Sequence, residues 1–127
     1  MLMTILSSRG NERMARKRKP RPTLSQLRAR GWFVECRHAH FNPGTTFAPM
    51  SENGKSTELI ASTTVVLYDP TIGRLSDGYP DATIEEAHIG KAWCGINDTF
   101  KRSRGVGIAV ERALYNYWVA TGIDVRR

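Results

Sequence analysis

Near its C-terminus the chain carries the pattern that most constrains its fold, an apolar stripe with helical spacing. The stripe recurs every three or four residues and consists of Val106, Ala109, Val110, Ala113, Leu114, Tyr117 and Trp118. This spacing puts the side chains on one face of an α-helix, which must be buried against a core. Asp98, or Asn97 beside it, suits the N-cap, and Gly122 suits a left-handed C-terminal cap. We therefore predict a core-facing helix from about Asp98 to Ala120.

The start of this predicted helix is basic and rich in glycine. Lys101, Arg102 and Arg104 lie in or near its first turns, together with Gly105 and Gly107. The unpaired N–H groups of a first turn carry partial positive charge, so cations there are unfavourable by up to about 1 kcal/mol unless an anion is bound. The composition therefore predicts an anion-binding helix start, with phosphate as the candidate anion. A solvated basic face is the alternative interpretation.

Three upstream segments have the composition of β-strands, namely residues 32–41, 57–68 and 83–94. The first alternates apolar and polar residues, with Trp32, Val34 and Cys36 predicted to face inward. The second is rich in β-branched residues and is the candidate for the central strand. In the third, the alternation predicts that the inward side chains are Ala87, Ile89 and Trp93 and the outward ones Glu86, His88 and Gly90.

These elements predict an α+β fold, a small antiparallel sheet of three or more strands packed against the long C-terminal helix. The segment from Thr23 to Gly31 adds a short helix, because it has a cap-like Thr, a helical pattern and a terminating Gly. The unpaired backbone groups at the edges of so small a sheet would be covered if copies of the chain packed together. We therefore expect a homo-oligomer.

Positive charge is concentrated at the N-terminal end of the chain. Residues 1–31 hold nine Lys or Arg and one acid, a balance of +8, whereas residues 32–127 hold ten cations and eleven acids, a balance of −1. We predict a disordered basic arm over residues 1–22 and a single α+β domain over residues 23–127. The arm would contact nucleic acid nonspecifically or act only as a solubilising extension. No apolar run approaches the roughly 18 residues of a membrane span, which predicts a cytoplasmic protein without membrane contact.

No catalytic signature is evident in the sequence. Gly-x-Ser-x-Gly, His-Glu-x-x-His and Walker-type patterns are all absent. We therefore predict that the protein is not an enzyme, has no catalytic residues and needs no cofactor.

One arrangement is compatible with a metal. Cys36, His38 and His40 alternate on one strand face, and Cys94 or His88 could supply the fourth ligand that zinc requires. Three ligands on one flat strand converge poorly, so we predict no metal site. Packed or half-exposed strand residues are the simpler interpretation.

The turn and helix start also carry a family resemblance, which rests on the order of several short motifs. A strand ending in Ala92-Trp93-Cys94 is followed by an Asp98-x-Phe100-x-Arg102 step, Arg104-Gly105, Ile108-Ala109 and Arg112-Ala113-Leu114. Over these 25 residues the chain resembles the phage Thoeris anti-defence proteins of the first type. The resemblance implies a small oligomeric protein that sequesters cyclic ADP-ribose isomers without degrading them, and some members also bind cyclic di- or trinucleotides. The basic arm and the 68–82 connection have no counterpart in it.

The resemblance implies a ligand site at the turn and helix start. Its members would be Asn97, Asp98, Phe100, Lys101, Arg102, Arg104 and Arg112. Asn97 and Asp98 would contact ribose hydroxyls. Arg102 and Arg104 would hold the pyrophosphate, a role that suits the bidentate donors of Arg.

For three of these residues, a purely structural role is the alternative to ligand contact. Asp98 could be only the N-cap of the helix, and Phe100 could be a core residue rather than a stacking one. Arg112 would complete the pocket, or that of a neighbouring copy, unless it only pairs within the helix or faces solvent.

A nucleic-acid-binding module is the alternative function. Strands followed by a helix that opens Lys-Arg-x-Arg are similar to the double-stranded-RNA-binding domain, in which the basic helix start spans phosphates across a groove. The net charge of +7 favours this interpretation. Against it, residues 32–127 carry no net positive charge, and no first helix with groove contacts is evident. A protein that binds a host protein is a third possibility.

Overall fold

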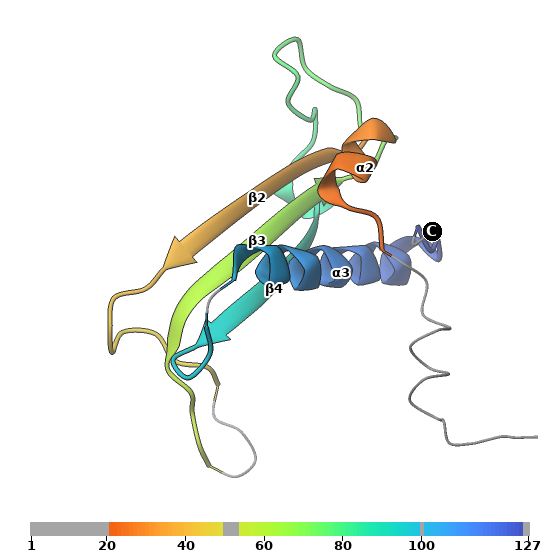
Figure 1. Cartoon of the computed structure of the whole chain (residues 1–127). Helices are drawn as coiled ribbons and strands as arrows, with labels where there is room; N and C mark the ends of the chain where they lie inside the picture. Colours follow the sequence, from red (N-terminus) through yellow and green to blue (C-terminus); the bar gives the residue numbers. More distant parts are fainter. Residues whose placement is uncertain (1–20, 50–53, 100, 126–127) are drawn as a thin grey trace, which may run out of the picture.

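The fold is α+β, as predicted, and within the described residues it consists of three antiparallel strands, a long C-terminal helix and short helical segments (Figure 1). The computed structural model describes residues 21–49, 54–99 and 101–125. Its elements are α2 (Leu24–Ala29), β2 (Phe33–His40), β3 (Leu59–Tyr68), the 3-10 helix η1 (Ile84–Glu86), β4 (His88–Gly95) and α3 (Arg102–Thr121). The strand order is β2-β3-β4, so the β-branched strand is central.

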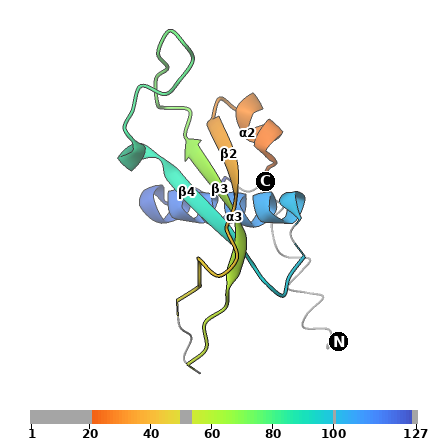
Figure 2. The same ribbon diagram turned by 90° about the vertical axis from the view of Figure 1, so that its left-hand side faces the viewer.

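Helix α3 lies across one face of the sheet (Figure 2) and supplies five of the eleven residues of the buried core cluster. The apolar stripe explains this packing, because the residues that α3 buries are Gly107, Ala109, Val110, Ala113, Leu114 and Tyr117. They meet Val65 and Leu67 of β3 and Ala92 of β4 in one cluster. Trp118 departs from the predicted stripe, since 47% of it is exposed.

Helix α3 begins later than the sequence pattern predicts. Its first residue is Arg102, and its N-cap is Lys101, whose side chain makes no capping hydrogen bond. The prediction of Asp98 or Asn97 as the N-cap is therefore wrong. The chain turns after β4, where the N–H of Asp98 donates to the carbonyl of Gly95, and this turn uses the residues that would have opened the helix. Gly122 is the left-handed C-cap that was predicted, with a φ of 78°.

The two faces of β4 are opposite to those predicted. Gly90 and Ala92 are buried under α3, and 49% of Trp93 is exposed on the far side of the strand. Side chains alternate along a strand, so a shift of one residue exchanges the two faces. Gly90 determines which face of β4 packs against α3, because a Cβ there would lie 2.0 Å from the carbonyl oxygen of Ala109.

Helix α2 forms where the sequence predicts a short helix. Thr23 and Gln26 make a capping box, in which the Thr23 hydroxyl accepts from the Gln26 N–H. Leu27 is fully buried and joins the core beside Trp32. Most of the predicted basic arm, residues 1–20, lies outside the described residues. Its last residue, Pro22, is fully buried against the domain.

The outer edge of β4 is covered by side chains of α3. Arg112 donates from Nη1 to the carbonyl oxygen of Lys91 at 2.7 Å, and Asn116 donates from Nδ2 to that of Ile89 at 2.8 Å. These carbonyls point away from β3, so they would otherwise be acceptors on an open sheet edge. The two bonds protect this edge from pairing with another strand.

We expect Arg112→Ala to lower the free energy of unfolding by about 1 kcal/mol, because it removes a charge-assisted hydrogen bond at a partly solvated edge. Chemical denaturation followed by tryptophan fluorescence measures this change. Arg102→Ala is the matched control on the same helix, and it should be neutral or slightly stabilising since Arg102 lies at the positive end of the dipole. Equal losses in both variants would contradict the edge role of Arg112.

Candidate functional site

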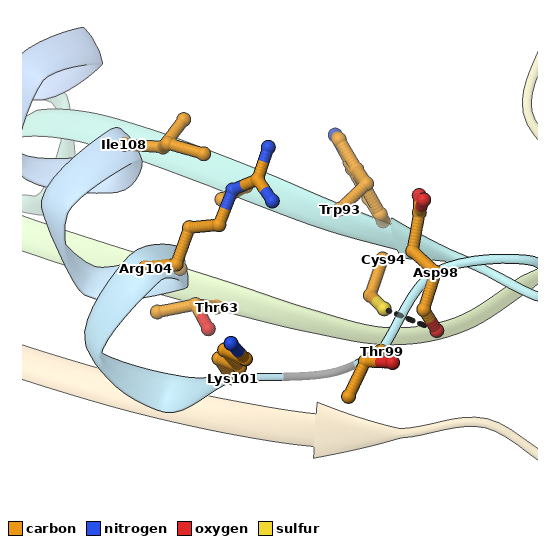
Figure 3. A pocket seen from close by; sticks show the side chains of 10 residues that line it. Thr63, Trp93, Cys94, Asp98, Thr99, Lys101, Arg104 and Ile108 are labelled. Carbon is orange, nitrogen blue, oxygen red and sulfur yellow. Dashed lines mark hydrogen bonds between the residues drawn. The ribbon is translucent and has the colours of Figure 1, made fainter.

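A small pocket lies where the end of β4 meets the start of α3 (Figure 3). Its volume is about 100 Å³. Its lining comes from β3, β4, the turn after β4 and the first turns of α3, and consists of Thr63, Ala92, Trp93, Cys94, Asp98, Thr99, Lys101, Arg104, Gly105 and Ile108. The hollow lies at the reversal from β4 to α3, and the turn there contributes Asp98 and Thr99 to its lining.

Three of the seven predicted ligand residues line this pocket together. They are Asp98 on the turn, Lys101 at the N-cap and Arg104 in the first turn of α3. Figure 3 shows Lys101 and Arg104 on the α3 side of the hollow, with Asp98 on the opposite side. The pocket thus combines two cations, one carboxylate and the positive end of a 20-residue helix.

The other four predicted residues do not line the pocket. Arg102 lies in the first turn of α3 but contributes no lining, and Asn97 is exposed on the turn. Arg112 is bound to the carbonyl of Lys91 and does not line this pocket. Phe100 lies outside the described residues, and its predicted packing or stacking stays a prediction.

Thr63 is a pocket residue that sequence reasoning missed. It is only 1% exposed, and its Oγ1 is hydrogen-bonded to Nδ1 of His38 at 2.9 Å. Gly105 leaves room for it, since a Cβ at Gly105 would lie 2.7 Å from the Thr63 hydroxyl. The signal in the sequence was the run of three hydroxyl residues, 62–64, inside an otherwise apolar central strand.

The histidine behind Thr63 favours its neutral form. Desolvation lowers the pKa of His38, and the charges of Arg102 and His40 lower it further. Because a hydroxyl both donates and accepts, Thr63 can bond Nδ1 of the neutral imidazole whichever ring nitrogen carries the proton. The bond fixes this buried hydroxyl at the floor of the pocket.

The thiol in the pocket is held in its protonated form. Burial raises the pKa of Cys94, and the Asp98 carboxylate raises it further, although Arg104 acts in the opposite direction. The Cys94 Sγ donates to the carbonyls of Gly95 and Asp98 at 3.6 and 3.7 Å. Since the thiolate is the reactive form of cysteine, this thiol is suited to packing rather than nucleophilic attack.

The alternating Cys36, His38 and His40 do not converge on a point. Sγ of Cys36 lies 4.0 Å from Nε2 of His38, while the other ring nitrogen of His38 is used by Thr63. In the described part of the chain, no three or more His, Cys, Asp or Glu side chains are grouped so that they could hold a metal ion.

No protein family, curated protein or solved structure matches the chain. Of the helices within the described ranges, none combines the length and the apolar composition that crossing a bilayer requires.

Proposed function

We propose that the protein binds a phosphorylated small molecule, a cyclic nucleotide signal, in this pocket and sequesters it without chemical change. The observation that carries the proposal is the position of Lys101 and Arg104 at a helix start with no acid in its first turn. A phosphate in the pocket would meet both cations and the free N–H groups of the turn. The Asp98 carboxylate is suited to accept hydrogen bonds from ribose hydroxyls beside the phosphate.

The size of the pocket limits how a nucleotide would bind. Sites that enclose a drug-sized ligand measure roughly 300 to 1,000 Å³. A hollow of about 100 Å³ accommodates a phosphate and part of its sugar, so the rest of the ligand would lie over the rim.

Isothermal titration calorimetry tests this proposal with cyclic ADP-ribose isomers and cyclic di- and trinucleotides. We expect one of these classes to bind and Arg104→Ala to weaken its binding roughly tenfold to a hundredfold, because charge-assisted hydrogen bonds to phosphate are lost. Arg30→Ala is the matched control, since it removes the same charge from the end of α2, outside the pocket. Ligand released by heating should be recovered unchanged.

Three results would contradict the proposal. Absence of binding by every compound would remove the nucleotide class. Equal loss of affinity in the Arg104 and Arg30 variants would move the site away from the pocket. Recovery of a cleaved ligand would show turnover instead of sequestration.

A second candidate function is the binding of double-stranded RNA, and the position of α2 favours it. Leu27 of α2 and Val110 of α3 belong to one core cluster, so both helices lie on the same face of the sheet. The resulting order of helix, three strands and helix is that of the double-stranded-RNA-binding domain, whose helices contact the grooves of A-form RNA. Fluorescence anisotropy with a labelled RNA duplex distinguishes this function, because such binding should weaken steeply as salt rises.

A further inference from the structure

We propose that the open edge of β2 pairs antiparallel with β2 of a second copy of this chain, so that two three-stranded sheets become one continuous sheet. The pairing would be centred on Cys36. It would place Glu35 of each copy opposite Arg37 of the other. This interface is separate from the pocket and does not depend on the proposed function.

The two edges of the sheet differ in how other parts of the fold bind their outward backbone groups. On β4, Arg112 and Asn116 occupy two successive outward carbonyls at 2.7 and 2.8 Å. On the β2 side, the contacts come from α2 and lie before Cys36: the Trp32 N–H donates to the carbonyl of Leu27 at 3.0 Å, and Arg28 donates to that of Val34 at 3.4 Å. The β4 edge is therefore closed at its middle, whereas these contacts on the outer strand β2 leave out Cys36 at its centre.

The direction of the β2 backbone groups follows from its neighbours. The N–H of Phe41 donates to the carbonyl of Ile60 on β3, so odd-numbered residues of β2 bond inward to the sheet. Even-numbered residues then direct their N–H and C=O groups outward. The contacts of Trp32 with Leu27 and of Val34 with Arg28 agree with this assignment. Cys36, at the middle of β2, thus presents both backbone groups to the open edge.

Charge selects the register of the pairing. Glu35 and Arg37 lie on the face of the sheet away from α3 and form an ion pair of 3.0 Å within one chain. In a two-fold antiparallel pair centred on Cys36, Glu35 faces Arg37 of the second copy in both directions. Centring the pair on Glu35 or Arg37 instead would set like charges opposite each other, which is unfavourable. The two-fold symmetry makes each favourable contact occur twice.

Exchanging the charges tests the inference on the full chain. For the wild-type protein, sedimentation equilibrium should give a mass that corresponds to at least two associated chains. Glu35→Arg and Arg37→Glu should each weaken the association by about tenfold or more, because like charges then face each other at both symmetry-related contacts. An equimolar mixture of the two variants should recover the association, since one copy is then positive and the other negative at both positions.

The mixture separates this interface from a structural role within one chain. Both variants lose the intrachain ion pair, so only a contact between copies can restore the association. Arg30→Glu is the control for charge reversal away from β2, and it should leave the mass unchanged. Circular dichroism checks that each variant is folded, which we expect because both side chains are on the strand surface.

Each remaining outcome would overturn the proposal. A wild-type protein that stays a single chain at every concentration tested excludes the interface. Single variants that keep the wild-type mass show that assembly uses another surface. A mixture that fails to regain the mass shows that Glu35 and Arg37 do not face each other between copies.

Discussion

Gly90→Ala is expected to lower the free energy of unfolding by about 3 kcal/mol or more, the upper end of the cost of overpacking a core. The added Cβ would lie 2.0 Å from the carbonyl oxygen of Ala109 and 2.4 Å from the N of Ala113. Both atoms belong to the backbone of α3, so relief requires the helix to move away from the sheet. Urea denaturation followed by the fluorescence of buried Trp32, which packs edge-on against Tyr117, measures the loss.

Gly73→Ala is the matched control for Gly90→Ala. A Cβ at Gly73 would meet nothing within 4 Å, and its φ is outside the left-handed region, so the substitution should change stability by less than about 1 kcal/mol. If Gly90→Ala were as mild as Gly73→Ala, the close packing of α3 on β4 would be incorrect.

Leu27→Ala should cost between about 2 and 5 kcal/mol of stability, the range for removing a fully buried leucine. Leu27 has no exposed surface and joins α2 to a core otherwise made by the sheet and α3. The loss would show that this six-residue helix is an integral part of the domain rather than a surface appendage. Differential scanning calorimetry and urea denaturation both detect an effect of this size.

Leu75→Ala provides the comparison for Leu27→Ala, because 48% of Leu75 is exposed in the connection between β3 and η1. It should stay within about 0.5 kcal/mol of the wild type. A Leu27 variant with an equally small effect would contradict the role of α2 in the core.

The parts of the fold that could be predicted are those with a local physical signal. The apolar spacing predicted α3, Gly122 predicted its end, and Thr23 predicted the start of α2, because each depends on neighbouring residues. The phase of β4 was not predictable from alternation. The alternation predicts that Gly90 faces outward. In the structure, Gly90 instead contacts the backbone of α3, a helix distant in sequence.

The candidate site likewise contains residues that the sequence predicted and residues that it did not. Asp98, Lys101 and Arg104 were found because charge and helix position are visible in one short segment. Thr63 was missed, since it lies on a strand about 40 residues earlier in the chain and enters the pocket only through sheet pairing with β4. Arg112 does not line this pocket, and its position on α3 does not reveal that β4 offers it a carbonyl.

The sequence by itself determined the elements, the basic helix start and the uneven charge of this protein, because periodicity, capping and composition act over a few residues. Only the tertiary structure decided which face of β4 is buried, which cations share a pocket and which sheet edge is covered. These features depend on contacts between segments far apart in the chain. Their geometry is set when α3 packs across the sheet.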